Sequence, residues 1–180
     1  MRWEGLFADL EGQLAAEERR ELDSEVAERT RRERALVDLT ARLAGGLGHA
    51  VALTVEGGRS AAGTLTDVGD GWLLLDTGRL EVLVPQPALV AVSGLPPHAD
   101  PARTARRFGL GYALRALARD RATVEVEVAG GPPLVGTVDV VGSDHLVLAE
   151  HAAGEARRRE NVRRVTAVPF TAVRLVGSRR

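Results

Sequence analysis

Hydrophobic residues change their spacing near residue 45, and this change divides the chain. Before it, they recur every three or four residues, as on one face of a helix. The first such stripe consists of Trp3, Leu6, Phe7, Leu10 and Leu14. Leu36, Leu39 and Leu43 form a second stripe, and no proline interrupts the interval. The pattern predicts an N-terminal helix over residues 1–44.

The middle of this predicted helix is almost entirely polar. Leu22 and Val26 stand nearly alone among charged residues, and Glu28 lies four residues before Arg32, a spacing that stabilises helices. A continuous helix of this span would be roughly 60 Å long, which exceeds the width of a small domain. We therefore expect one end to serve docking or self-association. The alternative is a surface helix that folds back in two pieces.

Beyond the glycines at positions 45, 46 and 48, apolar residues alternate with polar ones, a pattern that predicts short β-strands. Five strands are expected, at residues 51–55, 61–68, 72–76, 79–84 and 88–95. The third, Trp72–Asp76, begins with an uninterrupted apolar run, which is typical of a strand buried on both faces. Residues 45–97 thus form a first β-rich domain.

A second helix is expected before another set of strands. Asp100 suits the N-cap position and Pro101 the first helical position, and helix-forming residues continue to about Ala118. This linking helix, residues 98–121, carries six arginines against two aspartates. Strands resume at Thr123 within a second β-rich domain, residues 122–180.

The two sets of strands repeat each other in sequence. Residues 51–75 align with residues 124–148 at an offset of 73 without a gap, and Gly63 meets Gly136 in this alignment. Further along, the match resumes at an offset of 84, which places an 11-residue insertion in the second copy at about residues 150–160. Glycines agree at the turns and aliphatic residues agree on the strands, so the repeat indicates a duplicated fold.

The first copy, VALTVEGGRSAAGTLTDVGDGWLLLDTGRLEVLVPQPALVAV, resembles the Sm-like family that includes bacterial Hfq. The shared features are an alternating first strand, a glycine turn, Gly-x-Leu in the second strand, an acidic and glycine-containing turn before an apolar third strand, and a short corner between strands four and five. The resemblance covers most of residues 49–95 and, more loosely, residues 122–176. Together with the repeat it implies an α+β fold: a long N-terminal helix and two small five-stranded antiparallel Sm-like or SH3-like barrels, each preceded by a helix.

The resemblance also implies single-stranded RNA binding, usually by rings of subunits, at two places in each barrel. One is the turn between strands two and three, where the first copy has Asp70–Trp72. The other is the corner between strands four and five, which contains Pro85–Pro87 in the first copy and Pro169–Thr171 in the second. Gln86 is able to hydrogen-bond a base there, and Phe170 is able to stack on one.

Composition and charge exclude several classes of protein but do not identify a binding partner. The net charge is −1, and with 3% aromatic residues the core must consist mostly of valine, leucine and alanine. The absence of cysteine excludes disulfides, thiolate catalysis and cysteine-ligated zinc. The chain begins without the basic start of a signal peptide, and no stretch approaches the ~18 apolar residues of a membrane span. We therefore expect a cytoplasmic protein that does not enter a membrane.

Positive charge gathers in the linking helix and in the insertion. Guanidinium groups suit contacts with phosphate, so these arginines are candidate nucleic-acid ligands. They are Arg103, Arg106, Arg107, Arg115, Arg157, Arg158, Arg159, Arg163 and Arg164. The alternative is that they pair with the acidic N-terminal region, where residues 1–45 contain 8 arginines against 11 acidic residues.

No arrangement of residues points to catalysis. The chain lacks the common nucleotide-binding and nucleophile motifs, and His145 and His151 flank Glu150 without the spacing of a metal site. Glu125 and Glu127, two apart on one strand face, are typical of solvated carboxylates. We therefore expect a non-catalytic regulatory protein that binds RNA or DNA and uses no cofactor, metal or small-molecule substrate.

The alternative function is that of a protein–protein adaptor or homo-oligomerisation module, which would use the N-terminal helix and the edges of the barrels. The residues expected to contact a partner are Trp3, Leu6, Phe7, Leu10, Leu14, Trp72, Gln86 and Phe170.

Overall fold

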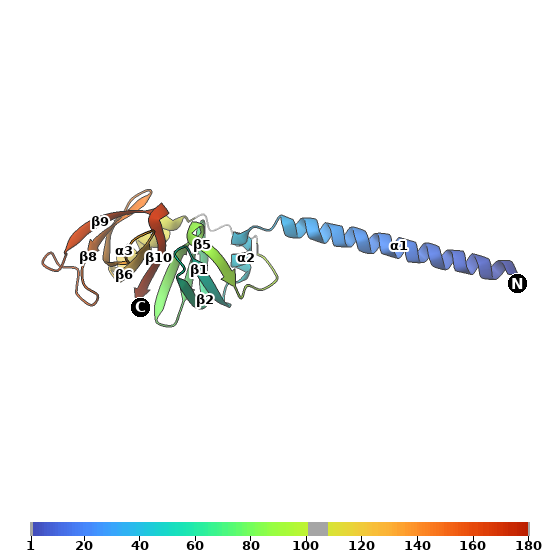
Figure 1. Ribbon diagram of the computed structural model, residues 1–180, viewed down its shortest axis with the longest axis horizontal. Coiled ribbons are helices and arrows are strands. Elements are labelled where there is room, and N and C mark those ends of the chain that lie inside the picture. Colours follow the sequence, from blue (N-terminus) through green and yellow to red (C-terminus); the bar gives the residue numbers. More distant parts are fainter. Residues whose placement is uncertain (1, 101–107, 180) are drawn as a thin grey trace. The chain divides into compact units, whose positions relative to one another are not determined.

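The computed structural model describes residues 2–100 and 108–179, and within the first range it describes side chains at residue 17 and from residue 19 onward. In these ranges it contains three α-helices and ten β-strands (Figure 1). The chain divides into two compact units, Met1–Asp38 and Leu39–Arg180. The first unit is helical and the second contains the sheet.

The N-terminal helix is continuous but shorter than predicted. Helix α1 (Arg2–Ala35) ends before the second apolar stripe, which begins a separate short helix, α2 (Leu39–Gly45), in the second unit. In α2, Leu43 is fully buried against the strands that follow. Within α1, Arg32 contacts Glu28 at 2.6 Å, which confirms that predicted pair. Leu39 and Leu43 of the second stripe therefore belong to a different helix and a different unit from the first stripe, whereas Leu36 lies between the two helices and is exposed.

The ten strands form two sets of five. The first set is β1 (Ala50–Val55), β2 (Ser60–Gly69), β3 (Trp72–Asp76), β4 (Leu80–Pro85) and β5 (Leu89–Ser93), with a 3-10 turn, η1 (Gln86–Ala88), before β5. The second set is β6 (Thr123–Val128), β7 (Leu134–Val141), β8 (His145–Glu150), β9 (Arg164–Pro169) and β10 (Val173–Arg179), with η3 (Phe170–Ala172) before β10. The first five lie within two residues of their predicted ranges.

The prediction of two separate five-stranded barrels is wrong. All ten strands belong to one open antiparallel sheet, in the order β5-β1-β2-β3-β4-β10-β6-β7-β8-β9 (Figure 1). The two sets join where β4 pairs with β10, with Leu83 opposite Val176 and Leu80 opposite Arg179. Each set has the same internal order, so the duplication persists inside a continuous sheet.

Two hydrophobic cores lie on opposite faces of β3 and β4, and they explain why the sets do not separate. Successive residues of a strand point to opposite faces. On β4, Val82 and Val84 therefore pack into the core of the first set, whereas Leu83 packs into the core of the second. On β3, Trp72 likewise joins the second core and Leu73 the first. A separate first barrel would leave Trp72 and Leu83 in water.

The geometry of the two copies agrees at the matched glycines. Because β2 and β7 come so close to the strands that follow them, β3 and β8, a Cβ at Gly63 would lie under 3.0 Å from the carbonyl oxygen of Asp76, and a Cβ at Gly136 would lie under 3.0 Å from that of Ala149. Asp76 and Ala149 are themselves related by the offset of 73. β2 and β7 also carry a register irregularity at matching positions, and such bulges bend a strand.

The two copies differ at the end of their last strand. β10 continues to Arg179 and uses Val176–Arg179 to pair with β4. β5 stops at Ser93, because Gly94 adopts a φ of 89°, a conformation that a side chain would strain, and a Cβ there would lie 2.6 Å from the carbonyl oxygen of Ala50. One outer edge of the sheet is therefore shorter than the strand that forms the seam.

The predicted start of the linking helix, Pro101, lies outside the described residues. Residues 101–107 lie outside the described part of the chain, and Phe108 and Gly109 precede the helix α3 (Leu110–Asp120). Gly109 instead forms a bridge with Asp70 of the first set. α3 buries Leu114 in the second core and ends at Arg121, whose φ is 50°.

Candidate nucleic-acid interface

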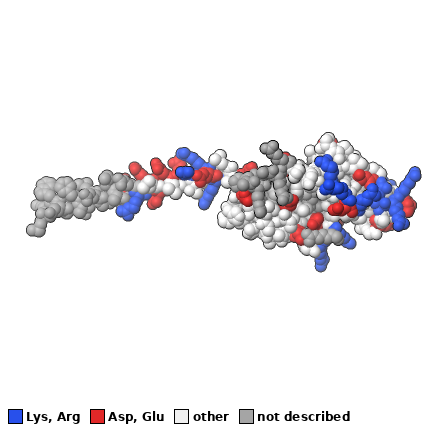
Figure 2. Space-filling model, turned by 180° about the vertical axis from the view of Figure 1, so that it is seen from behind, with Lys and Arg blue, Asp and Glu red and all other residues white. Residues whose placement is uncertain are grey.

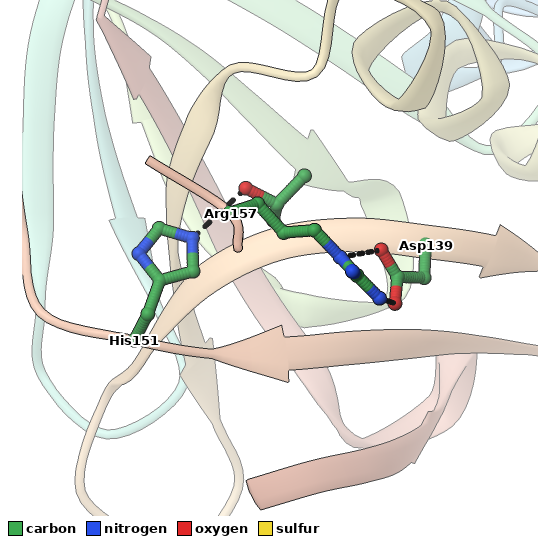
Figure 3. A network of polar contacts seen from close by, with 4 residues as sticks. Asp139, His151 and Arg157 are labelled. Atoms are coloured by element: carbon green, nitrogen blue, oxygen red, sulfur yellow. Dashed lines mark hydrogen bonds and ion pairs between the residues drawn. The ribbon is translucent and has the colours of Figure 1, made fainter. Parts of the chain in front are cut away.

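The insertion in the second copy forms the connection between β8 and β9, here called the arginine loop (residues 151–163). Arg157 anchors it to the sheet through two parallel hydrogen bonds to Asp139 on β7 (Figure 3). Its Nε donates to Oδ1 at 2.8 Å and its Nη2 to Oδ2 at 2.5 Å. The hydrogen bonds and charge of Asp139 raise the pKa of the Arg157 guanidinium. Arg157 thus fixes the loop and is not free for a ligand.

A second bidentate pair joins the two ends of the loop. Arg164, the first residue of β9, donates from Nε and Nη2 to the two carboxylate oxygens of Glu150, each at 2.9 Å. The hydroxyl of Thr166 donates to the same carboxylate. The hydrogen bond from Arg164 is the largest cause that lowers the pKa of Glu150. The middle of the loop and its two joined ends are therefore held by charge-assisted hydrogen bonds, the stronger class of such bonds.

His151 begins the loop and is buried. Its Nε2 lies 2.9 Å from the hydroxyl oxygen of Thr137, and its Nδ1 lies 3.0 Å from the carbonyl oxygen of Ala152 (Figure 3). The carbonyl can only accept, so Nδ1 donates to it, and in the neutral ring Nε2 accepts from Thr137. Both nitrogens have partners inside the protein, which makes His151 a structural residue rather than a metal ligand.

Three arginines of the loop have no such partner. Arg158, Arg159 and Arg163 are exposed, and none of them forms an ion pair with a residue that the structure describes. Figure 2 shows arginine side chains gathered over the part of the sheet that holds β8 and β9. The loop therefore presents three available guanidinium groups on a backbone that two neighbouring arginines hold in place.

Acid should weaken the anchor at Glu150. Its pKa is lowered in the folded protein, so its contribution to stability is complete above the unfolded pKa of about 4.3 and is lost as the pH falls through the lower, folded value. We expect the stability advantage of wild type over Glu150→Gln to shrink between about pH 5 and pH 3. Urea unfolding of both proteins at each pH measures it.

The matched control is Glu155→Gln, which alters an exposed carboxylate in the same loop. If the wild type and Glu150→Gln differ by a constant amount across the pH range, the pairing with Arg164 does not set the pKa of Glu150.

A separate hollow, here called the aromatic hollow, lies beside the start of α3. It has a volume of about 420 Å³ and is lined by Phe108, Tyr112, Arg115 and Phe170 together with Gly109–Gly111 and the turn at Gly142 and Ser143. Arg115 was predicted as a nucleic-acid ligand, but Phe108 and Tyr112 were not singled out. No pattern in the sequence indicated this pair, because Phe108 precedes α3 and the two residues are not neighbours on one helix.

Hydrogen bonds to the sheet position the aromatic residues of this hollow. The carbonyl oxygen of Phe108 accepts from the indole nitrogen of Trp72 at 2.7 Å and from the backbone N–H of Asp70 at 3.2 Å. The N–H of Phe170 donates to the carbonyl oxygen of Asp144 at 2.7 Å. The main chains of both residues are therefore fixed where they line the hollow.

The positions that the family resemblance implied are occupied by internal contacts. Trp72 is buried, and its indole is bonded to Phe108. The side-chain oxygen of Gln86 accepts a hydrogen bond from the Thr40 hydroxyl of α2 at 3.1 Å. Phe170 is partly buried against the second core, although it also lines the aromatic hollow.

Other predicted residues lie where the structure gives no side chain. Arg103, Arg106 and Arg107 fall in residues 101–107, outside the described part of the chain. The backbone of α1 includes the first apolar stripe, but its side chains are likewise not described. These are Trp3, Leu6, Phe7, Leu10 and Leu14.

Of the two carboxylates on β6, Glu125 is exposed as expected, but Glu127 does not have the expected solvated character. Glu127 is buried, and its Oε1 lies 2.5 Å from Nη2 of Arg59, while Glu125 lies 3.9 Å from the same nitrogen. They line a cavity of about 420 Å³ at the seam between the two strand sets. Because Arg59 belongs to the first copy and the glutamates to the second, this group ties the two copies together.

Searches against protein families and curated proteins returned no match to this chain. Among the described residues, no helix has both the length and the apolar character needed to cross a membrane. The same residues contain no group of three or more potential metal ligands from histidine, cysteine, aspartate and glutamate. Function must therefore be argued from the two surfaces described above.

Proposed function

We propose that this protein binds nucleic acid, RNA or DNA, through the arginine loop and catalyses no reaction. One observation carries the proposal: Arg157 and Arg164 are held by carboxylates, whereas Arg158, Arg159 and Arg163 are exposed without an ion pair among the described residues. Phosphate oxygens are the natural partners of exposed guanidinium groups.

The anchors of the loop favour such binding for an entropic reason. Ordering a flexible loop on binding costs free energy, and a loop fixed beforehand avoids part of that cost. The pair of Arg164 and Glu150 joins the two ends of the arginine loop, and Arg157 holds its middle against Asp139. Phosphate contacts then release counterions, so the affinity should fall steeply with salt.

Replacing the three available arginines tests the proposal. We expect Arg158→Ala, Arg159→Ala and Arg163→Ala, combined in one variant, to weaken binding of single-stranded RNA and DNA. The slope of log K against log salt should also become shallower by about 2, since each phosphate contact on a single strand contributes about 0.7. Fluorescence anisotropy from about 50 mM to about 200 mM salt measures both quantities.

The matched control removes the same charge from α1, as Arg20→Ala, Arg31→Ala and Arg34→Ala, all at exposed positions. It should bind like wild type. The proposal fails if wild type does not bind at about 50 mM salt, where phosphate-driven affinity is strong, or if the control loses as much affinity as the loop variant.

The resemblance to the Sm-like family remains a prediction, and the proposed interface does not depend on it. The arginine loop is an insertion in the second copy with no counterpart in the first. The positions that the resemblance implied, at Trp72 and Gln86, make internal contacts instead. The proposal therefore concerns a feature particular to this chain.

A second function, self-association through α1, is favoured by a different observation. This helix of 34 residues forms a unit of its own, and Leu22 and Val26 are 60% and 63% exposed on it. Helices in proteins gain most of their stability from packing an apolar face rather than from propensity. We propose that a second copy of α1 provides that packing.

Deleting residues 1–35 separates this function from nucleic-acid binding. We expect the shortened protein to sediment as a monomer while keeping the melting temperature of the second unit. Analytical ultracentrifugation and thermal unfolding measure the two properties. A shortened protein that self-associates as the full chain does would place the interface outside α1.

A further inference from the structure

The aromatic hollow and the arginine loop lie at opposite ends of the same two strands. The loop connects the end of β8 to the start of β9, whereas the hollow includes Gly142 and Ser143 just before β8 and Phe170 just after β9. Six residues of extended strand separate the two ends by about 20 Å. A ligand that follows β8 and β9 from the loop would reach the hollow.

The two rings beside α3 form an exposed stack. Phe108 and Tyr112 have their centroids 4.3 Å apart and their planes inclined by 18°. Phe108 is 50% exposed and Tyr112 is 44% exposed, which is unusual for two large rings in a chain with 3% aromatic residues. A further flat aromatic group that stacked on this pair would remove apolar surface from water.

A positive charge stands next to the stack. Arg115 is exposed and forms no ion pair with any residue that the structure describes. A Cβ built at Gly111 would lie 3.5 Å from Nη1 of Arg115 and 3.6 Å from Cε2 of Phe170. The guanidinium and the Phe170 ring therefore flank the floor of the hollow, which is bare because residue 111 has no side chain.

We infer that the aromatic hollow holds one unpaired base of a single-stranded nucleic acid, stacked on Phe108 and Tyr112, with the neighbouring phosphate on Arg115. The inference rests on the proposed function and adds the substrate class to it. Proteins that bind single-stranded nucleic acids combine aromatic rings with arginine. The rings stack on bases, since every base has a π-face, and the arginine contacts the backbone, since every phosphodiester linkage carries a charge. In a duplex both faces of a base are covered by its neighbours, so a duplex cannot fill the hollow in this way.

Replacing one ring tests the inference. We expect Tyr112→Leu, which keeps an apolar side chain on the helix, to weaken binding of an adenine-rich DNA strand of roughly 12 nucleotides by about tenfold. Tyr112→Phe keeps the ring and should bind like wild type. An RNA strand of the same sequence reports whether the 2′-hydroxyl matters.

A variant that fills the hollow is expected to remain folded, so that a loss of binding is informative. A Cβ at Gly111 makes only ordinary van der Waals contacts, and alanine is favoured over glycine inside a helix. We expect Gly111→Ala to raise the melting temperature and to lower the affinity for the single strand. The melting temperature shows that any loss of binding does not come from loss of structure.

A spectroscopic probe locates the base directly. Tyr112 is the only tyrosine of the chain, so protein labelled on tyrosine gives one set of ring signals in NMR. Stacking of a base should move these signals, and an abasic strand of equal length, which has the same phosphates, should not move them. Affinity for the abasic strand should be about tenfold lower than for the adenine-rich strand.

The outcomes separate this inference from the proposed function. The base-binding site is contradicted if the DNA strand binds but the Tyr112 signals do not move. It is also contradicted if Tyr112→Leu binds as tightly as wild type and the abasic strand binds as tightly as the adenine-rich strand. Loss of binding in the arginine-loop variant would in that case still support the proposed function. If the arginine-loop variant also binds like wild type, both are overturned.

Discussion

Leu83→Ala is expected to destabilise both copies of the duplicated fold at once, by about 3 kcal/mol. Leu83 lies on β4 of the first copy, is 2% exposed, and packs into the core of the second. The substitution changes a residue of the first copy but leaves a cavity in the core of the second. Chemical denaturation should show one transition for residues 39–180, and hydrogen exchange should become faster in β7 and β8 as well as in β3 and β4.

The control for this result is Val90→Ala on β5, where the valine is 63% exposed and the expected loss is below about 0.5 kcal/mol. Two separate transitions, or faster exchange confined to the first copy, would show that the copies unfold independently despite the common sheet.

Gly136→Ala is expected to cost about 3 kcal/mol, although it adds a single methyl group. The new Cβ would overlap the backbone of Ala149 and Glu150, and backbone on a paired strand cannot move aside as a flexible side chain can. Because the copies match, Gly63→Ala should cost a similar amount by overlap with Asp76 and Thr77. Urea unfolding of each variant against wild type gives the free energies.

Gly177→Ala is the matched control, because Gly177 also lies within a strand of the sheet. The nearest atoms to its Cβ would be 3.9 Å and 4.0 Å away, so the methyl group fits. A cost at Gly136 as small as that at Gly177 would contradict the close approach of β7 and β8.

Local features of the fold were predictable because their causes are local. Alternation located the strands, and the apolar run of Trp72–Asp76 correctly indicated burial on both faces. The joining of the two copies was missed, because pairing of β4 with β10 depends on residues almost a hundred positions apart. The run Val82–Val84 was the available sign, since a strand facing solvent on one side would have a polar residue in its middle.

The presence of arginines at the candidate interface was predictable, but which of them are paired and which are available was not. The sequence identified the arginines of the insertion, yet it could not distinguish Arg157 and Arg164 from the rest. That distinction depends on Asp139 and Glu150, which lie 18 and 14 positions away and are brought near by the pairing of strands. The stack of Phe108 on Tyr112 was not predictable, because Phe108 lies before α3 and no helical spacing relates the two rings.

The early end of β5 affects whether the sheet can be extended by pairing with another molecule. The seam uses Val176–Arg179 on β10, whose counterparts in the first copy are Val92–Leu95. Of these, Gly94 has turned away at a φ of 89° and Leu95 packs against the first core. If β9 of another molecule paired with β5 in the register that β4 and β10 use, only Val92 and Ser93 of these four residues would be available for pairing. Gly94 thus acts as a stop that limits the joining of repeats to the two within one chain.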